Sequence, residues 1–242
     1  MSRHSPELLR HSLSRQAEKD DAEKGGLMAG QANEMVYQLK VTVKESKPPI
    51  WRRFQVAGNI TLHRLHLILQ DVMGWTNSHL YRFDIGGIQY SVPDPVEDDF
   101  NELHFVDSRR TKLSKVVPRE KARFTYEYDF GDSWEHQILV EKILPSEPAA
   151  QYPLCLAGKR ACPPEDCGGI WGYDELLEII RDPTHEEYQS MMEWLGGTFD
   201  PEEFDVDRVN RLLLRSHRAK GPGRADVPEA FRKAFESEDK KR

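Results

Sequence analysis

The sequence predicts an α+β fold, in which a β-grasp-like mixed sheet with a crossing helix is followed by a C-terminal helical segment. Three observations lead to this prediction. An alternating segment and a second strand-like segment lie between residues 37 and 56, a run at helical spacing follows them, and the hydrophobic period becomes helical beyond Pro145. Hydrophobic residues make up 38% of the 242-residue chain, which suffices for a core.

The first elements are a hairpin and a helix. Residues 37–43 alternate apolar and polar side chains, and residues 50–56 read as a second strand after the turn at Lys47-Pro48-Pro49. Thr61 is typical of a helix N-cap, and the helical spacing after it ends at Gly74. The order strand, strand, helix is the expected start of a sheet with one crossing helix.

Four further segments read as two pairs of strands, and each pair flanks a turn that contains glycine. They are residues 79–85 and 88–91, around Gly86-Gly87, and residues 122–130 and 134–144, around Gly131-Asp132-Ser133. The acidic residues 97–102 are poorly patterned, so we expect a solvated loop there.

Three helices are predicted beyond Pro145, over residues 173–181, 186–195 and 206–214. Asp182-Pro183-Thr184 separates the first two, and Gly196-Gly197 follows the second. We expect these helices to cover the second face of the sheet, because the sheet alone would leave that face bare.

Charge divides the chain into three segments. Residues 1–34 are predicted to be a disordered or loosely helical extension, and residues 215–242 a basic, partly helical tail with a net charge of +4. The domain between them, residues 35–214, comprises the sheet with its helix (35–144) and a cysteine-rich loop with helices (145–214), and its net charge is −10. The formal net charge of −7 for the whole chain excludes a uniformly basic nucleic-acid binder.

The sequence also predicts the compartment. It has no run of about 18 apolar residues that would span a membrane, and its first residues lack the apolar core of a secretory signal. Three cysteines are an odd number, which argues against a disulfide framework and for a reducing environment. We therefore expect a cytoplasmic protein that makes no membrane contact.

The cysteines are the first candidate site, because Cys155, Cys162 and Cys167 all lie within 13 residues. Thiolates bind zinc tightly, and a structural site needs four ligands. We favour His136 as the fourth ligand, with His185 and Asp166 as weaker alternatives. The spacing differs from the CxxC knuckle of common zinc modules, so free thiols in a loop are the competing interpretation.

The second candidate is the segment 126–136, YEYDFGDSWEH, in which Asp129 and Asp132 flank a glycine and His136 follows. Such a group can hold a divalent cation or supply an acid and a base for catalysis. The competing interpretation is a tight hairpin, since Asp and Gly favour turns for purely local reasons.

Other features give weaker indications. His63 and His66 share a helix face, either as ligands or as histidines at the edge of the core. Trp51 with its two arginines could contact nucleic acid. The usual phosphate-binding, dinucleotide-binding, serine-hydrolase and HExxH motifs are absent from the sequence.

Several longer motifs resemble one known family. They are WRRFQV, VMGW, HLYRFDI, YEYDFGDSWEH, CPPEDCGGIWGY, DPTHEEY and FDPEEFD. Together they resemble the plasmid pRiA4b ORF-3-like family, also labelled transposon passenger protein, over about residues 35–215. The resemblance implies an association with mobile elements but no particular chemistry. The chain retains DFGDSWEH and all three cysteines, which favours a metal site; Tyr188 stands where many relatives carry a second histidine, which argues against a metal role for DPTHEEY.

Two functions follow as hypotheses. The first is a non-catalytic module, stabilised by a structural zinc, that binds a protein or nucleic-acid partner. The second is a metal-dependent hydrolase or nuclease with Asp129, Asp132 and His136 around an open metal position, joined by Glu165 or Asp166. The charge of residues 35–214 disfavours nucleic acid, so we favour the first.

Overall fold

The computed structural model describes residues 35–93, 105–147 and 150–217. Expectations for the N-terminal extension, the acidic loop at 97–102 and the tail beyond residue 217 lie outside the described residues. No helix in the described part of the chain is long and apolar enough to cross a membrane.

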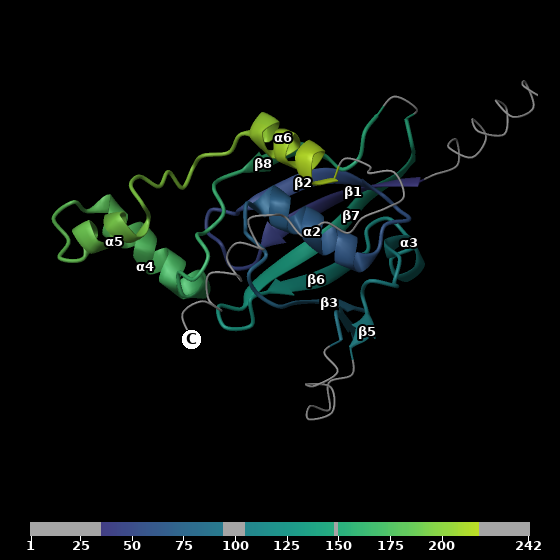
Figure 1. Cartoon of the computed structure of the whole chain (residues 1–242), viewed down its shortest axis with the longest axis horizontal. Helices are drawn as coiled ribbons and strands as arrows, with labels where there is room; N and C mark the ends of the chain where they lie inside the picture. The colour runs from purple at the N-terminus through teal and green to yellow at the C-terminus, as the bar shows by residue number, and fades with distance from the viewer. Residues whose placement is uncertain (1–34, 94–104, 148–149, 218–242) are drawn as a thin grey trace, which may run out of the picture.

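The described residues form one eight-stranded sheet with five helices (Figure 1). The strand order is β5-β4-β3-β6-β7-β1-β2-β8, and all neighbours are antiparallel except β4 and β5. The strands are β1 (Met35–Val43), β2 (Trp51–Ala57), β3 (Tyr81–Ile85), β4 (Ile88–Ser91), β5 (Val106–Asp107), β6 (Arg123–Tyr128), β7 (Trp134–Pro145) and β8 (Leu154–Lys159). The helices are α2 (Leu62–Met73), α3 (Leu113–Val116), α4 (Gly169–Arg181), α5 (Tyr188–Trp194) and α6 (Val206–His217). The predicted α+β class with a mixed sheet and a crossing helix is therefore confirmed.

The crossing helix α2 begins and ends as its sequence predicts. The Thr61 side chain accepts a hydrogen bond from the Arg64 amide, and Gly74 ends the helix in the left-handed conformation, with φ of 95°. The apolar side of α2 packs on the sheet, where Leu62, Leu65 and Leu69 are fully buried.

Side chains on the sheet alternate between two very different faces. Leu39 and Val41 of β1 are fully buried in the core, whereas Lys40 and Thr42, which alternate with them, are only partly buried. The outward positions of the neighbouring strands β2 and β7 are mostly polar too, for example Arg53 and Gln137, with Trp51 and Leu139 as exceptions. The sheet therefore has one face in the core and one polar face.

The C-terminal helices do not cover that polar face, contrary to our expectation. Helix α6 packs against α2 and β8, and its Leu213 joins the core on the α2 side. Helices α4 and α5 stand beyond one end of the strands (Figure 1). The physical reason is that the outward residues of the sheet are polar, so covering them would bury groups that water already satisfies.

Two further differences concern short elements. The cysteine-rich segment, expected to be a loop, begins with strand β8, which pairs with β2 at the edge of the sheet. Strand β5 and helix α3 have no counterpart among the predicted elements. Both are too short to give a period in the sequence.

Candidate functional site

Three segments that are distant in sequence meet at one end of the sheet. They are the connection from α2 to β3, the turn between β6 and β7, and the loop that precedes α4. The pairing of β3 with β6 places Tyr81 opposite Tyr128, so the next residues outward, Leu80 and Asp129, also meet. The Asp129 amide donates a hydrogen bond to the Leu80 carbonyl at 2.9 Å.

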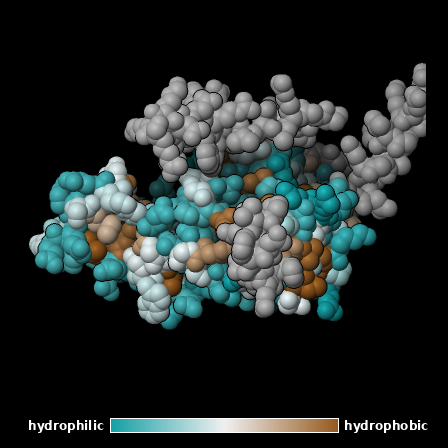
Figure 2. All heavy atoms as spheres, turned by 60° about the horizontal axis from the view of Figure 1, so that its bottom comes forward, coloured by the Kyte–Doolittle hydropathy of each residue, from teal (hydrophilic) through white to brown (hydrophobic). Residues whose placement is uncertain are grey.

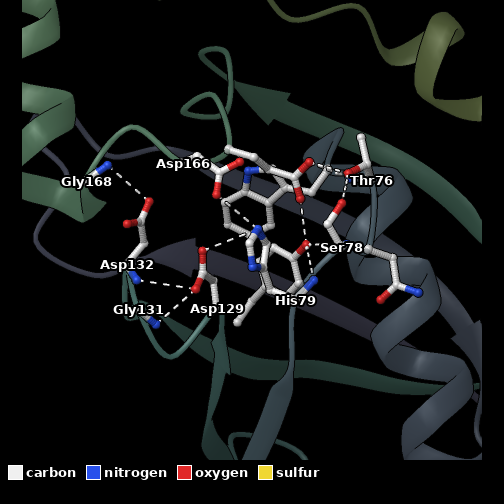
Figure 3. Close-up of polar contacts among 12 residues, drawn as sticks. Thr76, Ser78, His79, Asp129, Gly131, Asp132, Asp166 and Gly168 are labelled. Carbon is white, nitrogen blue, oxygen red and sulfur yellow. Dashed lines mark hydrogen bonds and ion pairs between the residues drawn. The ribbon is translucent and has the colours of Figure 1, made fainter. Parts of the chain in front are cut away.

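The turn after β6 fixes the carboxylate of Asp129. Its Oδ1 accepts hydrogen bonds from the amides of Gly131 and Asp132, at 3.0 and 3.4 Å (Figure 3). The backbone of Asp129 is in the left-handed region, with φ of 58°, which aspartate tolerates better than most residues. With Oδ1 held by the turn, Oδ2 points to His79 (Figure 3).

Hydrogen bonds tie the loop before α4 to the other two segments. The Glu165 carboxylate accepts from the Tyr128 hydroxyl at 2.6 Å and from the Thr76 amide at 3.1 Å, and also from the Thr76 hydroxyl. The Asp132 carboxylate accepts from the Gly168 amide at 3.1 Å. These hydrogen bonds position the loop so that the Asp166 carboxylate lies next to the His79 ring.

The result is a cluster of His79, Asp129 and Asp166. The His79 Nε2 atom lies 3.6 Å from Asp129 Oδ2 and 3.2 Å from Asp166 Oδ1 (Figure 3). One potential ligand atom from each residue lies within 4.8 Å of the other two, and it is the one group of this kind in the described ranges. Asp129 is buried, His79 is partly buried and Asp166 is exposed, so the cluster opens to solvent on one side.

The environment of the imidazole nitrogen is the most informative detail. His79 Nε2 is shielded from solvent, and its two polar neighbours are both carboxylate oxygens, Asp166 Oδ1 at 3.2 Å and Asp129 Oδ2 at 3.6 Å. A positive charge between these three atoms would satisfy all of them. A divalent cation would supply that charge, and nitrogen with carboxylate oxygens suits zinc or manganese.

The structure separates the candidate residues of the segment 126–136. Asp129 belongs to the cluster and Asp132 supports it through Gly168, but His136 does not join them. His136 lies within β7, fully buried, with its ring against Trp75 and Tyr126. Burial lowers the pKa of His136 to about 4, so the ring is neutral at pH 7.

The three cysteines are free thiols in the structure. Cys155 lies in β8, and Cys162 and Cys167 lie in the loop before α4. Burial raises the pKa of Cys155 to about 11 and that of Cys167 to about 12, and it also raises the pKa of Cys162. In the described residues, the thiols and His136 form no group of three ligands as compact as the His79 cluster. The Cys155, Cys162, Cys167 and His136 zinc site stays a prediction.

The sequence did not indicate His79 as a ligand, because its partners Asp129 and Asp166 are far along the chain. We expected His79 to begin the strand over residues 79–85, but β3 begins only at Tyr81 and leaves His79 in the connection. The two histidines on α2, by contrast, form hydrogen bonds with tyrosine side chains of the protein. His63 contacts the Tyr81 hydroxyl at 2.9 Å, and buried His66 contacts the Tyr126 hydroxyl at 2.8 Å. His185, a weaker ligand candidate, is exposed in the connection between α4 and α5.

Fold and site together define an α+β protein with an aspartate–histidine cluster at one end of a mixed sheet. The chain belongs to the plasmid pRiA4b ORF-3-like protein family, whose model matches residues 35–208. It is similar to "Uncharacterized protein y4hQ" of Sinorhizobium fredii (strain NBRC 101917 / NGR234), with 40% identity over 180 residues, which are 74% of this chain and 90% of the relative.

A solved structure has the same fold. The crystal structure of "Protein of Unknown Function MM3350" from Methanosarcina mazei Go1 matches with a TM-score of 0.64 and 41% sequence identity, over 72% of this chain and 97% of that one. The names of these two relatives state no activity, and the association with mobile elements stays a prediction.

Proposed function

We propose that this chain is a non-catalytic binding module whose partner-binding surface is organised by a divalent cation at His79, Asp129 and Asp166. The observation that carries the proposal is the convergence of the solvent-shielded His79 Nε2 with two carboxylate oxygens, at 3.2 and 3.6 Å, from two other segments of the chain. Protein ligands from three separate segments make the binding of the cation depend on the fold.

Exposed apolar side chains beside the cluster support a binding role. Leu80 and Phe130 directly follow His79 and Asp129 and are 61% and 42% exposed, and Trp171 in the first turn of α4 is 79% exposed. Elsewhere, the face shown in Figure 2 carries separate hydrophobic areas in a mostly hydrophilic surface. A partner held by a cation and a few apolar contacts fits this surface better than one held by a continuous apolar patch.

The net charge of the segment that supplies Asp166 favours a protein partner over nucleic acid. Residues 145–214, which supply Asp166, contain five basic and 15 acidic side chains, whereas residues 35–144 contain 15 of each. The excess negative charge repels phosphate groups and attracts cations.

Metal titration tests the site directly. We expect the full chain to bind one Zn²⁺ or Mn²⁺ by calorimetry. Asp129→Asn should weaken the affinity by more than the roughly 10- to 100-fold that follows the loss of a group supporting a ligand, because here a charged ligand itself is lost. Asparagine keeps the oxygen that accepts from Gly131 and Asp132, so the turn is preserved. The matched control is Asp84→Asn, since Asp84 accepts from the Gly87 amide in a different turn.

Elemental mass spectrometry of the same proteins separates this site from the predicted zinc site. Metal that is lost in Asp129→Asn but kept in Cys162→Ser belongs to the His79 cluster. Metal that is lost only in Cys162→Ser, together with a lower melting temperature, belongs to the cysteines and removes the proposal. If none of these proteins binds metal, the proposal is wrong.

One observation favours a metal-dependent hydrolase as the second candidate. The three side chains would hold a cation with protein ligands from one side, and because Asp166 is exposed, water or a substrate could reach the other side, as in catalytic metal sites. Glu165 and Asp132 lie in the same two segments as the aspartates of the cluster. Their carboxylates, however, accept hydrogen bonds from Tyr128 and Gly168, so they are already engaged.

An assay with bis(p-nitrophenyl) phosphate and p-nitrophenyl acetate, with Zn²⁺ or Mn²⁺ added, distinguishes the two functions. For the binding module we expect no hydrolysis above that of the metal in buffer. Metal-dependent turnover that disappears in Asp129→Asn and Asp132→Asn, with the fold unchanged by circular dichroism, would instead establish the hydrolase.

A further inference from the structure

The polar face of the sheet contains a depression of about 430 Å³ that is separate from the metal cluster. Its floor is formed by outward side chains of three adjacent strands, β6, β7 and β1. Strand pairing places Arg123 opposite Leu139, and Leu139 opposite Lys40, so the two cations lie in one row across the sheet. The next row contributes Gln137 and Thr42, which are also paired with each other.

The charged groups of this depression are mostly positive. Lys40, Lys44 and Arg123 line it with a single carboxylate, that of Glu45. The Lys44 ammonium is paired with Glu135 at 2.7 Å. Glu141, on the same face, is bound by Arg53 at 2.6 and 2.8 Å, and Lys40 contributes to the lowering of its pKa.

Lys40 and Arg123 are positioned chiefly by neutral groups. The Lys40 ammonium lies 4.9 Å from the centre of the Trp51 ring, and the Arg123 guanidinium donates to the Gln137 side chain at 2.6 Å. A cation–π contact and an amide hold each side chain in place without cancelling its charge. The two cations therefore stay available for an anion, and their side chains are partly ordered before it binds.

We propose that this depression binds the phosphate group of an anionic ligand through Lys40 and Arg123. Arginine and lysine are the usual partners of phosphate oxygens. The hydroxyl of Thr42 and the amide of Gln137 provide further hydrogen-bond donors on the same floor. The site goes beyond the proposed function, since it shares no residue with the His79 cluster and needs no metal.

Titration of the full chain with inorganic phosphate, followed by calorimetry and by tryptophan fluorescence, tests the site. We expect saturable binding, weakened about tenfold by Lys40→Gln and by Arg123→Gln, since each removes one charge-assisted contact. Lys115→Gln, an exposed lysine of α3, is the matched control and should bind as the unmodified chain does. The two variants lie on different strands, so a folding defect in one leaves the other as a test.

Two further probes identify the source of the phosphate. A ten-nucleotide single-stranded DNA that binds more tightly than inorganic phosphate, with affinity falling steeply with salt, indicates a nucleic-acid backbone. A nucleoside monophosphate that binds as tightly as the oligonucleotide indicates a small phosphorylated ligand. The proposal is wrong if inorganic phosphate does not bind, or if all three variants, Lys115→Gln included, weaken it equally.

Discussion

Replacing Gly169 by alanine is expected to lower the free energy of unfolding by about 3 kcal/mol or more. A Cβ at this position would lie 2.3 Å from the Asp132 carbonyl oxygen, and the φ of 68° is unfavourable for alanine. Because Gly169 begins α4 directly against the turn after β6, the clash would push apart the two segments that carry Asp129 and Asp166.

The measurement is thermal or urea unfolding, with a melting temperature lower by about 6–12 °C for a chain of this size. Gly196→Ala is the matched control, since its φ is also positive, at 70°, but no atom lies within 4 Å of the added Cβ. We expect the control to lose only about 1 kcal/mol, from backbone strain alone. Equal losses in the two variants would contradict a close contact between α4 and the turn.

Acid is expected to destabilise the protein below pH 6.5, largely through His66. Burial lowers the pKa of His66 to about 3, from an ordinary value of 6.5. Above pH 6.5 the ring is neutral in both folded and unfolded chains, so it causes no pH dependence. Between pH 6.5 and 3 the unfolded chain binds a proton that the folded chain excludes, and stability falls by about 1.4 kcal/mol per pH unit.

The contacts of His66 explain why the folded protein excludes this proton. The ring stacks on Tyr81 with centroids 3.6 Å apart, and its two nitrogens contact the Tyr126 hydroxyl and the Asn77 side chain. The Tyr126 hydroxyl already accepts from Gln70 at 2.9 Å, so it is best placed to donate to the ring. Neutral His66 satisfies this network, and His136, whose pKa burial also lowers, acts in the same direction.

Unfolding free energies of the unmodified chain and of His66→Gln, measured from pH 7.5 to 4.5, test this prediction. We expect His66→Gln to be less stable at pH 7.5, because the stacking on Tyr81 is lost, but to have a shallower slope below pH 6.5. His185→Gln removes an exposed imidazole and serves as the control. Parallel curves for the unmodified chain and His66→Gln would show that His66 is not the source of the acid sensitivity.

Local patterns in the sequence predicted the elements that carry their own periodicity. The alternation of residues 37–43 and the stripe between Thr61 and Gly74 correspond to β1 and α2. Strand β8 was missed, because the segment LCLAGK alternates weakly and is a strand through its pairing with β2, which includes an irregularity between Arg53 and Phe54. The uncovered polar face was also missed, although the polar residues at outward positions of β1 and β2 indicate it.

The sequence by itself predicted the α+β class and the family, and it named Asp129 and, as a weaker alternative, Asp166 among several candidate ligands. Only the tertiary structure decided that they meet His79 rather than His136. In a strand the side chain of His136 points into the core, whereas the β3–β6 register and the hydrogen bonds of Glu165 bring His79 to the turn. Spacing along the chain encodes contacts within one element, but ligands from three segments are brought together only by strand pairing and packing.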